Sequence, residues 1–190
     1  MNSLGRVYVA LLHYPVYDRR RRSVSTSLTS MDVHDIARSC KTYGVHAYYI
    51  VQPLRTQNLL ARKIAEYWQR GPGGGFNANR KEALELIRVT ESVQEMQDQI
   101  LDETGLEPIY VATDAKRYPW SQSFSTVRNK IRDSDEPFTL LFGTGDGLDE
   151  SVITESDILL EPIEGPTDYN HLSVRGAAAI ILDRLLRVDP

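Results

Sequence analysis

The segment 143–148, with the sequence GTGDGL, directly follows the apolar run PFTLLF and has three glycines in five residues. Glycine lets backbone N–H groups approach a ligand closely and also permits positive φ. The loop lacks the GxGxxG spacing that opens a long helix, it has no Lys-Ser/Thr pair of a P-loop, and Asp146 would repel a phosphate. Taken alone, this loop therefore predicts no more than a tight turn.

The basic residues are concentrated in the N-terminal part of the chain. Residues 1–80 contain 12 Lys and Arg against four acids, whereas residues 81–190 contain 10 against 22, and the formal net charge is −4. A basic half on an acidic protein suits a phosphate-bearing partner. The basic part of the chain includes a run of four arginines: Arg19, Arg20, Arg21 and Arg22. This run could equally be a solvated charged loop.

Three aromatic residues lie beside the arginine run. His13, Tyr14 and Tyr17 follow the first apolar run of the chain. Aromatic rings next to a basic track can stack an unpaired base, although such residues equally often pack a loop onto the domain. We expect Tyr17 and the arginine run to contact RNA.

Composition excludes several other classes of protein. A chain of 190 residues that is 41% hydrophobic and 25% charged is typical of one globular domain, which we expect to span 1–190. A single cysteine and four scattered histidines predict neither a disulfide nor a metal site. No apolar stretch is long enough for a membrane helix, and residues 1–9 do not resemble a signal peptide, so we expect a cytoplasmic protein without membrane contact.

Short apolar runs alternate with amphipathic segments along the chain. We expect strands at 6–12, 45–51, 84–90, 108–113, 137–142 and 158–160, and helices at 33–43, 59–70, 92–103, 123–132 and 174–186. Asp32 is the expected N-cap of the first helix, and the glycines at 71–75 should end the second. This alternation predicts an α/β fold, in which a mostly parallel sheet has helices on both faces.

In an open α/β sheet the ligand binds at the carboxyl ends of the strands. Three loops follow predicted strands in the C-terminal half, at 113–117, 143–148 and 161–173. We expect these loops to meet around a ligand.

The C-terminal part of the chain resembles the SPOUT superfamily of RNA methyltransferases. The resemblance lies in the order and spacing of FGTGDGL, LEPIEG, YNHLSVR and an alanine-rich last helix. It implies a C-terminal trefoil knot that binds S-adenosylmethionine in a bent form, mostly through backbone groups. Carried over, it places these residues around the cofactor: Thr113, Gly143, Gly145, Gly147, Leu148, Leu160, Glu161, Pro162, Ile163, Gly165, Asn170, His171, Leu172 and Ser173.

The N-terminal half is similar to the same superfamily. In DVHDIARSCKTYG, Arg38 and the pair Tyr43-Gly44 match positions that face RNA in ribose-methylating SPOUT enzymes, while Asp32 replaces an asparagine. The resemblance implies that Arg38 binds an RNA phosphate or the nucleophile, with Asp32 as orienting group or proton acceptor. Alternatively, Asp32 only caps the helix and Arg38 only pairs with Asp35.

The sequence is compatible with three functions. The leading hypothesis is a homodimeric methyltransferase that uses S-adenosylmethionine to methylate a base or ribose of tRNA or rRNA. The second is an RNA-binding protein, such as a ribosome-assembly factor, that keeps the cofactor pocket without catalysis, and the third is a plain nucleotide-binding α/β domain. The sequence contains no evident RNA-recognition extension, so it does not select a particular RNA.

Overall fold

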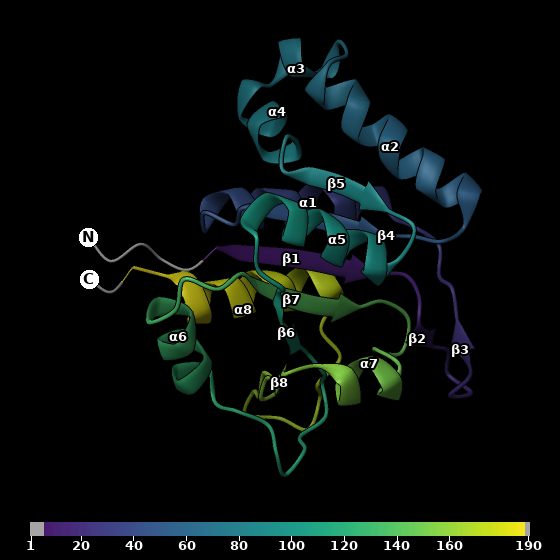
Figure 1. Ribbon diagram of the computed structural model, residues 1–190. Coiled ribbons are helices and arrows are strands. Elements are labelled where there is room, and N and C mark those ends of the chain that lie inside the picture. Colours follow the sequence, from purple (N-terminus) through teal and green to yellow (C-terminus); the bar gives the residue numbers. More distant parts are fainter. Residues whose placement is uncertain (1–5, 189–190) are drawn as a thin grey trace.

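A six-stranded parallel sheet forms the centre of the computed structural model, which describes residues 6–188 (Figure 1). The strand order is β5-β4-β1-β7-β6-β8, and every neighbouring pair is parallel. The strands are β1 (Val7–Leu12), β4 (Ala47–Val51), β5 (Ile87–Thr90), β6 (Ile109–Ala112), β7 (Phe138–Gly143) and β8 (Ile158–Leu159).

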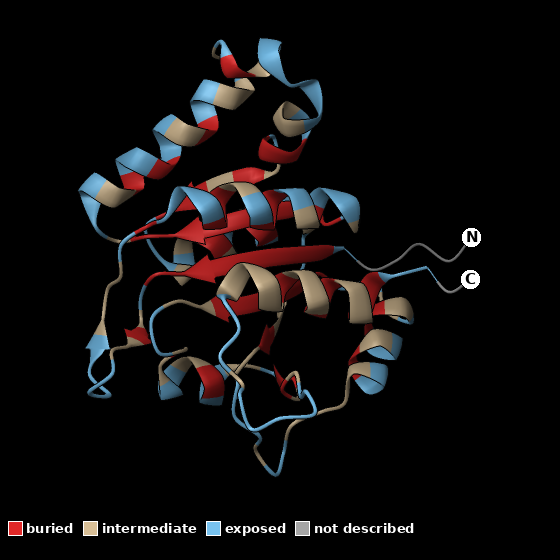
Figure 2. Cartoon of the chain, turned by 180° about the vertical axis from the view of Figure 1, so that it is seen from behind, coloured by how far each residue is buried: buried red, intermediate tan, exposed pale blue. Residues whose placement is uncertain are grey.

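The central strand β1 is buried along its whole length, as expected for a sheet covered on both faces (Figure 2). Its sequence VYVALL sends alternate side chains to opposite faces. Val7, Val9 and Leu11 join the core cluster formed with α1 (Ser30–Thr42), α6 (Phe124–Arg132) and α8 (Val174–Leu186). The side chains between them join the cluster formed with α5 (Val93–Thr104) and α7 (Glu150–Glu155). The predicted α/β fold with helices on both faces is therefore confirmed.

The first helix differs from its prediction at the N-terminus. Thr29, not Asp32, is the N-cap of α1, and Asp32 lies buried in the first turn. The Thr29 hydroxyl accepts a hydrogen bond from the Asp32 amide and donates one to the Asp32 carboxylate. Asp32 was expected as the cap because an acid before an apolar stripe is a common helix start, but threonine takes that role three residues earlier.

Two predicted loops contain secondary structure. The polar segment 14–30 includes an antiparallel hairpin of β2 (Val16–Tyr17) and β3 (Ser23–Val24). Beyond α2 (Arg55–Gln69), the glycine cluster forms the short helix α3 (Gly73–Phe76), and α4 (Ala78–Leu84) follows. The strand expected at 84–90 starts only at Ile87, because Leu84 still belongs to α4.

The segment after β8 lies against the loop after β6. The Leu160 amide donates to Ala112 O at 2.9 Å, the Glu161 amide donates to Gln122 O at 2.9 Å, and the Asn170 side chain donates to Ala115 O at 2.7 Å. The chain then enters α8, which contacts α1 and α6. These contacts suit a C-terminal segment folded back on the sheet, and the trefoil knot itself stays a prediction.

No helix between residues 6 and 188 is long and apolar enough to span a membrane. Within the same residues, no group of three His, Cys, Asp or Glu side chains is arranged to hold a metal ion.

Candidate functional site

A cavity of about 710 Å³ opens at the carboxyl edge of the sheet. All three loops expected to surround a ligand contribute to its wall, together with residues that follow β1. Its volume lies within the usual range of small-molecule sites. Of the residues singled out in the sequence, these line it: Asp32, Thr113, Gly143, Gly145, Gly147, Glu161, Ile163, Asn170, His171, Leu172 and Ser173.

The remaining predicted cofactor residues lie outside the lining. Leu148 and Leu160 are core residues, Pro162 is buried, and Gly165 is exposed. Leu148 packs in the cluster on the α5 side of the sheet and Leu160 in the cluster on the α8 side. Their side chains therefore support the loops from behind.

The loop 143–148 has a conformation that only glycine adopts readily. Gly145 has φ +62° and Gly147 has φ +103°. A Cβ added at Gly145 would lie 2.7 Å from Tyr17 O, and one at Gly143 would lie 2.6 Å from Leu148 N. The loop is thus more than a tight turn, because its backbone forms part of the cavity wall and packs directly against a second segment.

That second segment is the β2–β3 hairpin. The Asp146 amide donates to Tyr17 O at 2.8 Å, and the Tyr17 amide donates to Gly147 O at 2.9 Å. The arginine run forms the turn of this hairpin, so the sequence motif and the cavity are close neighbours. Figure 1 shows the hairpin at the edge to which the arrowheads of β1, β4 and β7 point.

The arginines in the turn have different environments. The Arg22 amide donates to the Asp18 carboxylate, and so do the Arg22 guanidinium, at 2.7 and 2.8 Å, and the Arg20 amide. These hydrogen bonds hold the pKa of Asp18 below its usual value. The guanidinium of Arg21 lies 3.9 Å from the centre of the Tyr17 ring. Arg19 and Arg20 are exposed beside this pair.

A chain of hydrogen bonds connects the end of β1 to the glycine loop. The Thr144 hydroxyl donates to Leu12 O at 3.1 Å and lies 2.5 Å from the Thr26 hydroxyl, whose oxygen is 3.0 Å from His13 Nδ1. Because the Thr144 proton points to Leu12, Thr26 donates to Thr144 and accepts from His13 Nδ1–H. We name these three residues the His13–Thr26–Thr144 relay.

His13 is the buried end of this relay, with 1% of its surface exposed. Burial lowers its pKa to about 4, so the imidazole is neutral, and its Nε2 has no hydrogen-bond partner among the described residues. The suggestion that His13 stacks a base is therefore wrong, whereas Tyr14 is exposed. Thr26 and Thr144 both line the cavity and were not predicted, because residues 118 positions apart give no local signal of their contact.

Asp32 faces the cavity together with Arg175 of α8. Arg175 Nη1 donates to Asp32 Oδ1 at 3.2 Å, and its Nε lies 3.7 Å from an Asp35 oxygen. A cation in the first turn of a helix is disfavoured by the helix dipole, so these carboxylates determine the position of Arg175. Sequence reasoning missed Arg175, although it is the last residue of the YNHLSVR motif.

Arg38 lies away from this cluster. It is exposed, it does not line the cavity, and the carboxylate of Asp35 is engaged by Arg175 instead. Six residues separate Asp32 from Arg38 on α1, which puts them about 9 Å apart along the axis and about 120° apart around it. One chain therefore brings Asp32, but not Arg38, to the cavity.

The cavity has an acidic lining. Two cations, Lys116 and Arg175, face five carboxylates: Asp32, Asp114, Asp146, Glu161 and Asp168. Such a wall favours a ligand with positive charge and disfavours a polyphosphate.

The fold of the chain is similar to that of solved SpoU methyltransferases. The structure of the SpoU methyltransferase AviRb from Streptomyces viridochromogenes in complex with AdoMet superposes with a TM-score of 0.56 at 17% identity, over 96% of this chain and 57% of that one. Residues 6–187 match the family described as SAM-dependent RNA methyltransferases. The chain belongs to this family.

Curated relatives match nearly the whole chain. An uncharacterized protein of Aquifex aeolicus is 42% identical over 94% of this chain and 87% of its own length. A tRNA (guanine-N(1)-)-methyltransferase of Oleidesulfovibrio alaskensis is 43% identical over 95% of this chain but only 42% of its own length. This chain thus spans less than half of the second relative.

The family match also makes the plain nucleotide-binding alternative wrong.

The cavity fits S-adenosylmethionine, the family's cofactor. Its acidic wall matches a sulfonium cation, and a Cβ added at Gly147 would meet no atom within 4 Å, so the backbone there is open to a ligand. Backbone groups of three loops can hold the adenosine and methionine parts without depending on particular side chains.

Proposed function

We propose that this chain methylates a nucleotide of tRNA and binds S-adenosylmethionine in the acidic cavity at the carboxyl edge of the sheet. The observation that supports this most is the meeting of the three loops after β6, β7 and β8 around one cavity with five carboxylates and two cations. The cofactor supplies an activated methyl group. The protein's task is then to align the RNA nucleophile with it and to accept a proton.

The proposed cofactor contacts follow the cavity wall. Thr113, Gly143, Gly145 and Gly147 would present backbone groups, and Glu161 with Ile163 would close the wall on the β8 side. Asn170, whose side chain is bonded to Ala115 O, would hold the last loop over the ligand together with His171, Leu172 and Ser173. Leu148, Leu160, Pro162 and Gly165 would act by shaping the backbone of these loops.

Asp32 and Arg175 would work as a pair. Both Asp32 carboxylate oxygens accept hydrogen bonds, from Thr29 and Arg175, so Asp32 suits an orienting role. The Arg175 guanidinium keeps further donors for an RNA phosphate or for the oxygen of the target nucleotide.

We place Arg38 in the catalytic site of a homodimer, where it reaches the cavity of the partner. Its exposure on α1 and its separation from the cavity of its own chain support this arrangement. It would bind an RNA phosphate beside the reacting group.

RNA would reach the cavity over the β2–β3 hairpin. Arg19, Arg20, Arg21 and Arg22 form its turn, and the hairpin is bonded to the loop 143–148. Arg21 already stacks on Tyr17, so Tyr17 would contact RNA through its edge or hydroxyl rather than through a free face.

The choice of tRNA rests on the relative in Oleidesulfovibrio alaskensis, which is named as a tRNA methyltransferase. More than half of that protein lies outside the match, so methylation at guanine N1 is not assigned to this chain. An RNA substrate would place the chain in the cytoplasm. We further propose that it forms a single domain, since the strands of the N-terminal half and those of the C-terminal half belong to one continuous sheet, joined where β1 pairs with β7.

Two measurements test the proposed function. Calorimetric titration should show binding of S-adenosylmethionine in preference to ATP, and preferential ATP binding would contradict the assigned cavity. Tritiated methyl groups should enter tRNA isolated from cells that lack the protein. Incorporation only into rRNA would contradict the choice of tRNA, and none into any RNA pool would favour a non-catalytic RNA-binding protein.

A further inference from the structure

One face of helix α2 is exposed and combines cations with an aromatic ring. Thr56, Leu60, Lys63, Tyr67 and Arg70 are all exposed, and at about 100° per residue they fall within a band about 80° wide. We name these five residues the α2 stripe. Figure 2 shows the outward side of this helix largely exposed, while Ala61 and Ala65 on its inner side are buried.

The surroundings of the α2 stripe are strongly basic. Residues 55–81 contain six cations and one acid, Glu66. Arg62 is bonded to Asn58 and to Val89 O, and Arg80 lies over the Trp68 ring. In the part of the chain that the structure describes, Lys63 and Arg70 pair with no carboxylate, and Glu66, which flanks them, pairs with neither.

Helix α2 begins beside the candidate site. The Leu28 amide donates to Gln57 Oε1 at 2.9 Å, and the Gln52 side chain, which precedes α2, donates to Thr26 O at 3.0 Å. Residues 26, 27 and 29 line the cavity. From this point the 15 residues of α2 extend for about 22 Å, and Figure 1 shows the helix leading away from the carboxyl edge of the sheet. At its far end the Gln69 side chain still donates to Leu84 O and Ile87 O, so the helix stays packed beside β5.

We propose that the α2 stripe is a second RNA contact, which binds the substrate strand outside the cavity. This inference rests on the proposed RNA substrate. Lys63 and Arg70 complement the phosphate backbone, and Tyr67, which is 47% exposed, offers a ring on which an unpaired base can stack.

Charge favours RNA over a second copy of the chain on this face. A symmetric dimer through the α2 stripe would place Lys63 and Arg70 near their own copies and bury cations that have no carboxylate partner. An RNA strand neutralises the same cations and releases counterions.

The decisive experiment measures how RNA binding depends on salt. A labelled 20-nucleotide single-stranded RNA is titrated with the full chain between 50 and 200 mM KCl. The Lys63→Ala/Arg70→Ala variant should reduce the slope of log K against log salt by about 1.4, which corresponds to about 25-fold weaker binding at 0.1 M. The matched control is Arg6→Ala/Lys130→Ala, which removes two exposed cations near the amino edge of the sheet and should leave the slope nearly unchanged.

A second pair of variants tests stacking separately from charge. Tyr67→Leu should weaken RNA binding roughly tenfold without changing the salt slope, whereas Tyr67→Phe should bind normally. Circular dichroism checks that each variant is folded, and calorimetry should show unchanged affinity for S-adenosylmethionine.

The outcomes separate this inference from the proposed function. An unchanged salt slope in the folded Lys63→Ala/Arg70→Ala variant would overturn the α2 stripe as an RNA contact, even if methyl transfer to tRNA is detected. The inference would also be overturned if the Lys63→Ala/Arg70→Ala variant lost a dimer in sedimentation while its salt slope stayed unchanged. That result would assign the face to a second copy of the chain. A reduced slope would support the stripe even if no RNA were methylated.

Discussion

The hydroxyl oxygen of Thr26 lies 2.5 Å from that of Thr144, so a residue near the basic hairpin and a residue of the glycine loop share a hydrogen bond beside the cavity. This bond belongs to the His13–Thr26–Thr144 relay, which continues to the backbone at the end of β1. The proposed RNA-facing and cofactor-facing segments are therefore held at a fixed distance from the same central strand.

Replacing Thr144 with valine should loosen the glycine loop. Thr144→Val removes both bonds of the hydroxyl and leaves Thr26 and Leu12 O without this partner, at a cost of about 1–3 kcal/mol. We expect the dissociation constant for S-adenosylmethionine to rise about tenfold in calorimetry, while Thr144→Ser retains near-normal affinity. Equal affinity for the valine and serine variants would show that the relay does not position the loop.

His13 should make stability depend on pH. Its folded pKa of about 4 lies below its ordinary value of 6.5, so only the unfolded chain takes up this proton between these values. The free energy of unfolding should therefore fall as the pH drops from about 6.5 to 4, by about 3 kcal/mol from this residue. Urea unfolding of the wild type and of His13→Gln across this window checks it. A pH dependence that is identical in both proteins would contradict a buried neutral His13.

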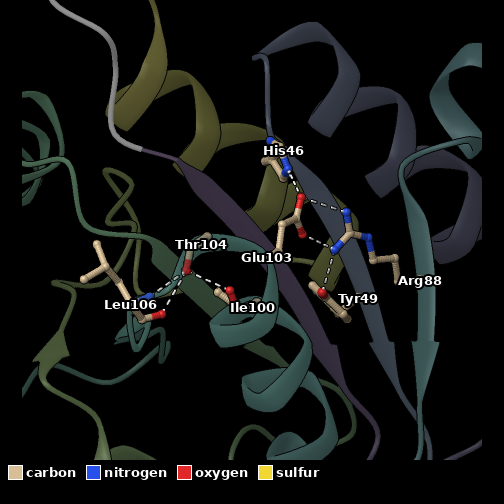
Figure 3. Close-up of polar contacts among 7 residues, drawn as sticks. All are labelled: His46, Tyr49, Arg88, Ile100, Glu103, Thr104 and Leu106. Carbon is tan, nitrogen blue, oxygen red and sulfur yellow. Dashed lines mark hydrogen bonds and ion pairs between the residues drawn. The ribbon is translucent and has the colours of Figure 1, made fainter.

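A second ionic cluster connects β4, β5 and α5, and none of its residues lines the cavity (Figure 3). Glu103 accepts hydrogen bonds from Arg88 Nη1 and His46 Nε2, both at 2.6 Å, and Arg88 also donates to the Tyr49 hydroxyl at 2.9 Å. The Arg88 bond, helped by His46, lowers the pKa of Glu103 to about 2. The cluster thus stabilises the sheet edge through an ionised Glu103.

Neutralising Glu103 should cost stability without affecting the site. Its contribution is complete above a pH of about 4.5 and is lost as the pH falls toward 2, because the folded pKa lies below the unfolded one. Since the group is partly exposed, we expect Glu103→Gln to lower the free energy of unfolding by about 1–2 kcal/mol at pH 7. Chemical denaturation measures this loss, and calorimetry should give an unchanged affinity for S-adenosylmethionine. A weakened affinity would mean that the cluster also acts on the cavity.

A side chain at Gly145 should block cofactor binding. Its φ of +62° is strained for other residues, and a Cβ would lie 2.7 Å from the carbonyl oxygen of Tyr17. We expect Gly145→Val to push the hairpin and the loop apart and to weaken binding of S-adenosylmethionine at least tenfold. The control is Gly75→Ala, where an added Cβ meets nothing within 4 Å and no effect is expected. Normal cofactor affinity in Gly145→Val would remove this loop from the proposed site.

The sequence predicted those features that depend on local patterns. Apolar runs located the strands of the sheet, and the rule for carboxyl ends of parallel strands correctly predicted that three loops would meet. Helix α4 was missed because the glycines before it indicate a break, and because LELIRVT has the apolar content of a strand along its whole length. The Thr26–Thr144 bond of the relay and the Asp32–Arg175 pair join residues more than 100 positions apart, and these polar side chains have no periodicity that could reveal the contacts.

The placement of Arg38 leads to a test of the proposed homodimer. Arg38→Ala should reduce methyl transfer severely and leave affinity for S-adenosylmethionine nearly unchanged, because Arg38 does not line the cavity of its own chain. If Arg38 completes the site of the partner, a dimer of one Arg38→Ala protomer and one Gly145→Val protomer keeps one intact site. That site combines the cavity of the first protomer with the Arg38 of the second.

Mixing the two inactive variants in equal amounts, with subunit exchange, should therefore restore about one quarter of wild-type methyl transfer, since half of the dimers are mixed and each has one working site. Mixing either variant with itself provides the baseline. If Arg38 instead serves the cavity of its own chain, each mixed dimer contains one site without the arginine and one without the cofactor, and the mixture stays at the baseline. Activity is thus recovered only if the two residues of a working site come from different chains. Differences in stability between the variants cannot produce such a recovery.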